Sequence, residues 1–182
     1  MTPPRIHGTK TLYEAEYIQV LEDDLEFSNG TRKKWHYAVL SGGEGVAVCA
    51  LTRNRELILV KEYRGAVRDY ILRVPAGFSG GEDPKEAAAR ELEEEVGLRP
   101  RKVALMGTSR PTNGSFRGLF IYIMLAEDLE EGTLKREPGE EDMEVYRVPL
   151  EKAYAMAENL EIEDPDSIVA ILTLKKHLSN VC

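Results

Sequence analysis

The segment Asp83–Gly97 constrains the fold most, because it carries the signals for both ends of a helix. Asp83 is a favourable N-cap, Pro84 suits the first helical position, and Glu86 completes the spacing of a capping box. Gly97 is typical of the position just after a helix. One apolar residue recurs every four positions, at Ala88, Leu92 and Val96. The segment therefore predicts an amphipathic helix with one buried stripe.

The polar side of this helix is unusually acidic. Seven acidic residues occur in the stretch, at Glu82, Asp83, Glu86, Glu91, Glu93, Glu94 and Glu95. Glu91 and Glu95 are four apart and share one face, which Glu94 borders. Like charges at this spacing destabilise a helix unless a cation lies between them. Oxygen ligands without His or Cys suit Mg²⁺ or Mn²⁺, so the pattern favours a metal site over a plain solvated face.

The remainder of the chain predicts a mixed sheet with a few helices. Short apolar runs predict strands at 46–51, 57–60, 70–74, 102–107, 119–126 and 143–148. Further helices are expected at 150–160 and 165–178. Residues 12–27 and 34–40 flank the turn signal at 28–30 and predict a β-hairpin. These elements do not alternate regularly enough for a Rossmann fold.

Charge and composition exclude several classes of partner. The net charge is −8 and no basic run is present, which argues against nucleic-acid binding. No run approaches the roughly 20 apolar residues that span a bilayer, and the N-terminus lacks an apolar stretch of signal-peptide length. Two cysteines, Cys49 and Cys182, exclude a disulfide framework. A cytoplasmic protein without membrane contact is expected.

Residues 77–98, GFSGGEDPKEAAARELEEEVGL, resemble the Nudix box. In that pattern a glycine and a glutamate precede the stretch REU-x-EE-x-GU, where U is a bulky aliphatic residue. The seven-residue gap between Glu82 and Arg90 and the whole second half match. The gap from Gly77 to Glu82 is four residues instead of the family's five, so the loop before the helix is one residue short.

Three further stretches are similar to the ADP-ribose pyrophosphatase branch of that family. They are KEYR at 61–64, LRVPAG at 72–77 and GEEDMEV at 139–145. Two positions depart from the branch. Arg73 stands where the branch usually has Glu, and SRPTNG at 109–114 replaces its usual S-P-G turn. The reaction class is therefore better defined than the substrate.

The resemblance implies roles for residues of the helix. Glu91 and Glu95 match the principal metal ligands, and Glu94 matches a further one. The carbonyl of Ala76 matches a backbone ligand, and Arg90 matches the residue that orients the metal-binding carboxylates.

Three residues outside the helix are also candidates. Glu141 matches the loop carboxylate that acts as general base, with Glu140 the alternative and a solvated loop acid the simpler interpretation. Arg64 matches a phosphate-contacting arginine, or is an ordinary surface residue. Trp35 can stack on a nucleobase, although packing within a strand explains it as well.

The expected fold is a Nudix α/β/α sandwich, with a mixed sheet between helices and an N-terminal β-hairpin. Residues 1–40 are expected to form a dimerising β segment, and residues 41–182 the Nudix hydrolase domain. The implied activity is Mg²⁺-dependent hydrolysis of a nucleoside diphosphate linked to another moiety, with ADP-ribose giving AMP and ribose 5-phosphate as the leading case. Another nucleotide sugar or a dinucleotide is an alternative substrate, and a nucleotide-sensing module is the non-enzymatic alternative.

Overall fold

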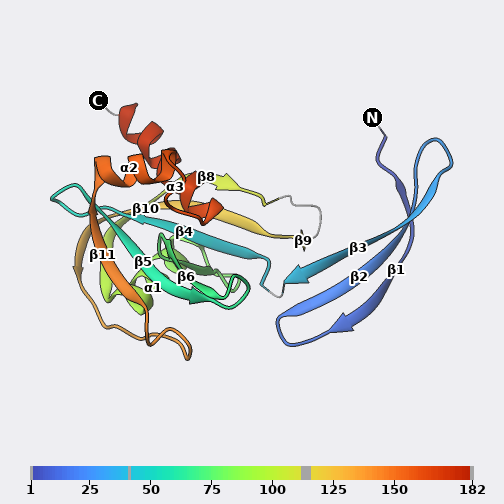
Figure 1. Ribbon diagram of the computed structural model, residues 1–182, viewed down its shortest axis with the longest axis horizontal. Coiled ribbons are helices and arrows are strands. Elements are labelled where there is room, and N and C mark those ends of the chain that lie inside the picture. The colour runs from blue at the N-terminus through green and yellow to red at the C-terminus, as the bar shows by residue number, and fades with distance from the viewer. Residues whose placement is uncertain (1, 41, 112–115, 181–182) are drawn as a thin grey trace. The chain divides into compact units, whose positions relative to one another are not determined.

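The computed structural model describes residues 2–40, 42–111 and 116–180. The chain divides into two compact units. One comprises Met1–Glu44 and Arg110–Phe120, and the other comprises Gly45–Ser109 and Ile121–Cys182. Figure 1 labels their helices and strands.

The first unit is a small sheet with the strand order β1-β2-β3-β9. Its strands are β1 (Arg5–Glu14), β2 (Ile18–Glu26), β3 (Arg32–Leu40) and β9 (Phe116–Arg117). β1, β2 and β3 pair antiparallel in turn, and β9 runs parallel to β3. The turn predicted at 28–30 joins β2 to β3, and Gly30 there has a φ of +82°.

The predicted hairpin is confirmed as β2 and β3, which pair across this turn, but β1 adds a third strand to which residues 12–14 belong. All ten residues of β1 are exposed. Such a strand shows no alternation of buried and solvated positions, which is the pattern that reveals a strand in a sequence.

The second unit contains two sheets. One has the order β7-β4-β10-β8, and the other has the order β11-β5-β6. The first is built from β4 (Glu44–Ala50), β7 (Ala76–Phe78), β8 (Leu98–Ser109) and β10 (Phe120–Glu131). The second is built from β5 (Glu56–Arg64), β6 (Asp69–Arg73) and β11 (Glu144–Pro149). The strands predicted at 46–51 and 57–60 lie in different sheets, and a bridge between Leu51 and Leu57 links them.

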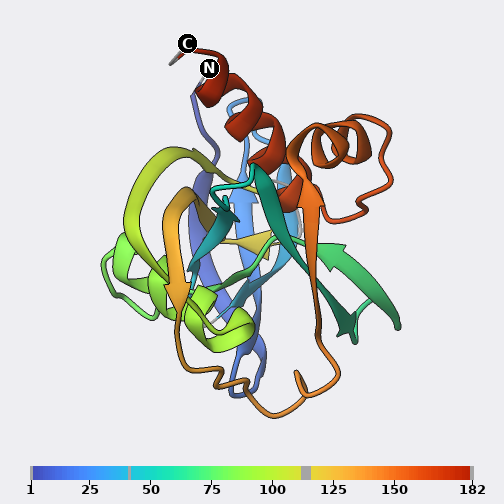
Figure 2. The ribbon, with the colours of Figure 1, turned by 90° about the vertical axis from the view of Figure 1, so that its left-hand side faces the viewer.

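Helices cover both faces of these sheets, at opposite sides in Figure 2. They are α1 (Pro84–Val96), α2 (Leu150–Glu158) and α3 (Pro165–Ser179). Alternate residues of β4 divide between two cores: Val46 and Val48 pack with α1, whereas Ala47 and Cys49 pack with α2 and α3. The expected α/β/α sandwich is thereby confirmed. No helix among the described residues is long and apolar enough to cross a membrane.

The boundaries of α1 follow the local signals predicted for them. The carboxylate of Asp83 accepts a hydrogen bond from the backbone N–H of Lys85 at 2.9 Å. Gly97 ends the helix with a φ of +75°, a left-handed conformation that favours glycine. Because both ends are set locally, the carboxylates of α1 are placed in a defined register against β7 and the loop that follows it.

Candidate metal and catalytic site

Close packing of α1 against β7 creates the first part of the site. A Cβ atom added to Gly77 would lie 2.2 Å from the carboxylate carbon of Glu91. Gly77 therefore has to lack a side chain for Glu91 to reach the strand. Burial raises the pKa of Glu91, and the neighbouring Arg90 opposes this rise.

Arg90 connects several groups at this end of the helix. Its guanidinium donates to the carboxylates of Glu91 at 2.8 Å, Glu94 at 2.9 Å and Glu82 at 3.0 Å. It also donates to the carbonyl of Phe78 at 2.8 Å. The loop that is one residue short thus still brings Glu82 to the helix. These are the contacts that the proposed orienting role of Arg90 requires.

A buried group of carboxylates forms the second part of the site. Glu62, Glu95 and Glu140 each offer an oxygen, and these oxygens lie within 4.8 Å of one another. Glu95 is 2% exposed, and its burial raises its pKa to about 8, although the charge of Arg73 acts in the opposite direction. An all-oxygen set of buried acids fits a hard divalent cation such as Mg²⁺ or Mn²⁺.

Arg73 holds two of these acids. Its guanidinium donates to both carboxylate oxygens of Glu62, at 2.5 and 3.0 Å, and to Glu95 at 2.7 Å. It also donates to the carbonyl of Ala76, the predicted backbone ligand, at 3.0 Å. The other oxygen of Glu95 accepts from the backbone N–H of Ala76 at 3.3 Å. Glu95 and Ala76 are therefore brought together, as their predicted roles demand.

The two loop acids differ in their surroundings. Glu140 is partly buried, and its carboxylate lies near those of Glu62 and Glu95. Glu141 is exposed and accepts a hydrogen bond from the backbone N–H of Gly139 at 2.8 Å. Hydrogen bonds from its own and the Gly139 backbone N–H groups lower the pKa of Glu141. The structure thus places Glu140, the alternative in the sequence-based prediction, beside Glu62 and Glu95, while Glu141 stays exposed to solvent.

The predicted substrate-binding residues lie in different units. Arg64, on β5, donates to Glu62 at 3.0 Å, and its side chain is 57% exposed. Trp35, on β3 of the first unit, is 39% exposed, and the ammonium of Lys33 lies 4.5 Å from its ring centroid. Arg64 is therefore hydrogen-bonded to one of the clustered acids, and Trp35 belongs to the other unit.

Comparison with known proteins identifies the family. The model of the NUDIX domain matches residues 43–170. The chain belongs to the Nudix family. The ADP-ribose pyrophosphatase of Bacillus subtilis (strain 168) is 34% identical over 92% of this chain and 91% of that protein. The ADP compounds hydrolase NudE of Escherichia coli (strain K12) is 27% identical over 96% of this chain and 93% of that protein.

A solved structure agrees with these relatives. The crystal structure of an ADP compounds hydrolase superposes with a TM-score of 0.83 and 28% identity, covering 99% of this chain and 96% of that chain. The recognition of the Nudix family and of its ADP-ribose pyrophosphatase-like branch is confirmed, and with it the prediction of a Nudix hydrolase.

Two residues of the Nudix site were missed by the sequence-based assignment. Glu62 occupies a buried position in line with Ile58 and Val60 on β5, where an apolar residue is the rule. Arg73 was noted only as a departure from the branch pattern. Strand pairing places Glu62 opposite Ile71, so Arg73 lies two residues further along the same face of β6. A buried acid next to a buried arginine on paired strands is the signal that reveals both.

One acid of α1, Glu93, holds the helix to neighbouring segments of the chain. The carboxylate of Glu93 accepts from the guanidinium of Arg99 at 2.6 Å and from the backbone N–H of Thr133 at 2.9 Å. Both hydrogen bonds lower its pKa. Glu93 thus connects α1 to β8 and to the segment that follows β10.

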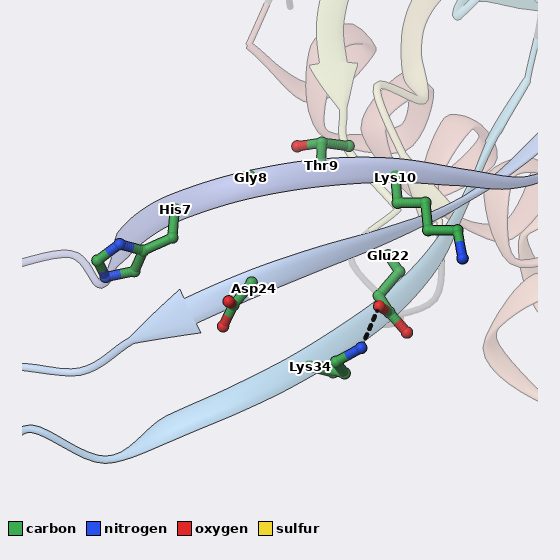
Figure 3. Close-up of a pocket in the computed structure, with 7 residues that line it drawn as sticks. All are labelled: His7, Gly8, Thr9, Lys10, Glu22, Asp24 and Lys34. Atoms are coloured by element: carbon green, nitrogen blue, oxygen red, sulfur yellow. Dashed lines mark hydrogen bonds and ion pairs between the residues drawn. The ribbon is translucent and has the colours of Figure 1, made fainter.

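A shallow depression lies on the first unit, lined by His7, Gly8, Thr9, Lys10, Glu22, Asp24 and Lys34 (Figure 3). Lys34 pairs with Glu22 at 2.7 Å, and Glu22 also bonds His36 at 2.9 Å. Asp24 pairs with Arg32 at 3.0 Å. Because these charged side chains pair with one another, the depression gives no indication of the charge or chemistry of a ligand.

Gly77→Ala is expected to disable the Nudix site while only weakening the fold. The added methyl group displaces the Glu91 carboxylate, and misplacement of a catalytic group by about 1 Å costs roughly 10²-fold in rate. Overpacking should lower the free energy of unfolding by about 1–3 kcal/mol. Turnover and thermal unfolding check this. Gly107→Ala is the control, because a Cβ there meets only Thr173 at 3.8 Å. Equal activity of the two variants would contradict the assignment.

Proposed function

We propose that this Nudix hydrolase cleaves the diphosphate of a nucleoside diphosphate linked to another moiety, with Mg²⁺ as the metal and ADP-ribose as the leading substrate. The products are AMP and ribose 5-phosphate. The observation that carries the proposal is the cluster of Glu62, Glu95 and Glu140, of which the first two are buried and the third is partly buried. The names of two relatives, an ADP-ribose pyrophosphatase and an ADP compounds hydrolase, support the substrate class.

The ligands proposed for the metal come from β7 and α1, with further acids on β5 and in the loop that precedes β11. They are the carbonyl of Ala76 and the carboxylates of Glu91, Glu94 and Glu95, with Glu62 and Glu140 as further acids near Glu95. A divalent cation bound there polarises phosphate oxygens and lowers the pKa of a bound water. Without it, a diphosphate would meet only negative charge at these acids.

Two arginines prepare the site for an anionic substrate. Arg90 holds Glu91 and Glu94 in one orientation, so these acids need little rearrangement when a metal ion binds. Arg64 is the exposed partner of Glu62, which Arg73 already engages through both oxygens. Arg64 can therefore turn away from Glu62 and donate to a phosphate without leaving a buried acid unpaired.

The proposed function is tested by measuring AMP release from ADP-ribose by the purified protein, with Mg²⁺ and with EDTA. ADP-glucose and diadenosine diphosphate serve as comparison substrates. Mg²⁺-dependent release of AMP and ribose 5-phosphate, with kcat/KM highest for ADP-ribose, is the expected result. A higher kcat/KM for a comparison substrate would replace ADP-ribose as the substrate. Binding of ADP-ribose without cleavage at any metal concentration would refute the hydrolase.

We further propose that residues 1–40 join two copies of the chain, and that the dimer works in a reducing cytoplasm. β1 is an edge strand and every one of its residues is exposed, including Ile6, Leu12 and Tyr13. An exposed edge with apolar side chains favours pairing with another chain. Cys49 is a buried free thiol, which is compatible with a reducing compartment.

Light scattering should give twice the 20.4 kDa mass of one chain at micromolar concentration. Leu12→Asp places a charge in the proposed interface and should produce monomers. Leu160→Asp is the matched control, because Leu160 lies just beyond α2 and is 70% exposed. A fully active monomer of the unaltered protein would contradict this proposal.

A further inference from the structure

Arg73 uses every hydrogen-bond donor that it has. A guanidinium carries five N–H groups. Those of Arg73 meet both oxygens of Glu62, one oxygen of Glu95, and the carbonyls of Val74 and Ala76. The distances run from 2.5 to 3.1 Å. The partners surround the guanidinium with oxygen atoms, as ligands surround a metal ion.

Burial makes the charge of Arg73 necessary. The side chain of Arg73 is 8% exposed, and those of Glu62 and Glu95 are 7% and 2% exposed. Removing one partner from a buried ion pair leaves an uncompensated charge away from water. Glu62, Glu95 and Glu140 carry three negative charges when ionised. Arg73 is the buried cation among them, and Arg64 pairs with Glu62 from the exposed side. The acids still outnumber these arginines, which favours a further cation.

We propose that Arg73 is a built-in cation of the site, which fills a position between Ala76, Glu62 and Glu95 that a divalent cation would otherwise take. It acts as a positioning residue, since it fixes the Glu95 carboxylate and the Ala76 carbonyl before any metal ion arrives. The chain consequently binds one divalent cation fewer than its set of oxygen ligands allows. This inference rests on the proposed metal site.

The oxygens held by Arg73 keep capacity for a metal ion. A carboxylate oxygen and a carbonyl oxygen each have two lone pairs. Arg73 takes one at the carbonyl of Ala76 and one at a single oxygen of Glu95. Arg73 therefore orders these two ligands without blocking them. Glu62, which accepts from both Arg73 and Arg64, keeps less free acceptor capacity than Glu95.

The number of Mn²⁺ ions bound per chain tests the proposal, measured by the electron paramagnetic resonance signal of free Mn²⁺ without nucleotide. R73Q removes the charge and places an amide oxygen nearby, so it should bind one Mn²⁺ more than the unaltered protein. R73K keeps the charge and should bind the same number. R64Q is the matched control, since Arg64 also contacts Glu62 but is exposed, and its count should not change.

Thermal unfolding gives a second measurement. Added Mn²⁺ should raise the melting temperature of R73Q more than that of the unaltered protein, because the ion replaces the missing charge. If R73Q is unfolded without metal, its recovery of native circular dichroism in Mn²⁺ supports the proposal, and failure to recover refutes it. Equal Mn²⁺ counts in the unaltered protein and R73Q overturn this inference alone. Absence of Mn²⁺ binding by both also overturns the proposed metal site.

Discussion

Glu95→Gln is expected to lower kcat by about 10²-fold or more, even at saturating Mg²⁺. Glu95 contacts Arg73, the backbone of Ala76 and the neighbouring acids Glu62 and Glu140. The amide keeps the shape of the side chain but loses the charge that holds a divalent cation. Metal-assisted activation of water supplies several kcal/mol of transition-state stabilisation, and about 1.4 kcal/mol corresponds to a factor of ten.

The same substitution should change the stability of the metal-free protein by no more than about 1 kcal/mol, because two effects oppose each other. Burial raises the pKa of Glu95 to about 8, so the folded state favours an uncharged side chain, and repulsion with Glu91 is relieved. Gln has one acceptor oxygen, however, whereas both oxygens of Glu95 accept, from Arg73 and from the backbone N–H of Ala76, so one donor loses its partner. Thermal unfolding in EDTA and kcat in Mg²⁺ are the two measurements.

Glu93→Gln is the control on the same helix. Glu93 contacts Arg99 and Thr133 and none of the proposed ligands. Its replacement should leave kcat near that of the unaltered protein. Turnover of Glu95→Gln close to that of Glu93→Gln would remove Glu95 from the metal site.

The Nudix helix was predictable because its determinants are local. Asp83 and Gly97 cap it within its own segment, and the spacing of its apolar residues decides which face is buried. The same logic explains why β4 was found, since an uninterrupted apolar run indicates a strand buried on both faces. Local signals of this kind need no knowledge of the neighbouring elements.

The contact of Glu62 with Arg73 was not predictable in this way. It depends on the register of β5 against β6, which is a relation between two segments. β1 escaped prediction for the opposite reason, since an exposed strand has no buried face to produce a pattern. The Nudix pattern thus identifies the helical ligands, whereas the charge that balances them appears only when the strands are paired.

Two of the carboxylates in the acidic loop 136–142, Glu140 and Glu141, differ in their surroundings, and we propose different roles for them. Glu140 lies near Glu62 and Glu95, where its lone pairs are available to a metal ion. Glu141 remains exposed, and its lowered pKa keeps it ionised. A ligand cannot easily serve as a free base as well, so we propose Glu141 as the proton acceptor and Glu140 as a further ligand.

Loop movement is required for Glu141 to reach the attacking water. Gly139 adopts a φ of +102°, and Arg136 joins the carbonyl of Glu141 to that of Glu95 with two hydrogen bonds of 3.3 Å. The loop is therefore tethered at the end of α1 and turns at a glycine. Loops of this kind commonly complete a catalytic site after substrate binds.

The two substitutions are expected to fail in different ways. Glu141→Gln should lower kcat by roughly 10²-fold, the lower end of a general-base contribution, with little change in KM, because substrate binding rests on the metal ligands and Arg64. Glu140→Gln should instead raise the Mg²⁺ concentration needed for half-maximal activity, and kcat should recover at saturating Mg²⁺. If kcat of Glu140→Gln stays low at saturating Mg²⁺ while Glu141→Gln is unimpaired, the two roles are reversed. If both variants match the unaltered protein, the proton acceptor lies outside this loop.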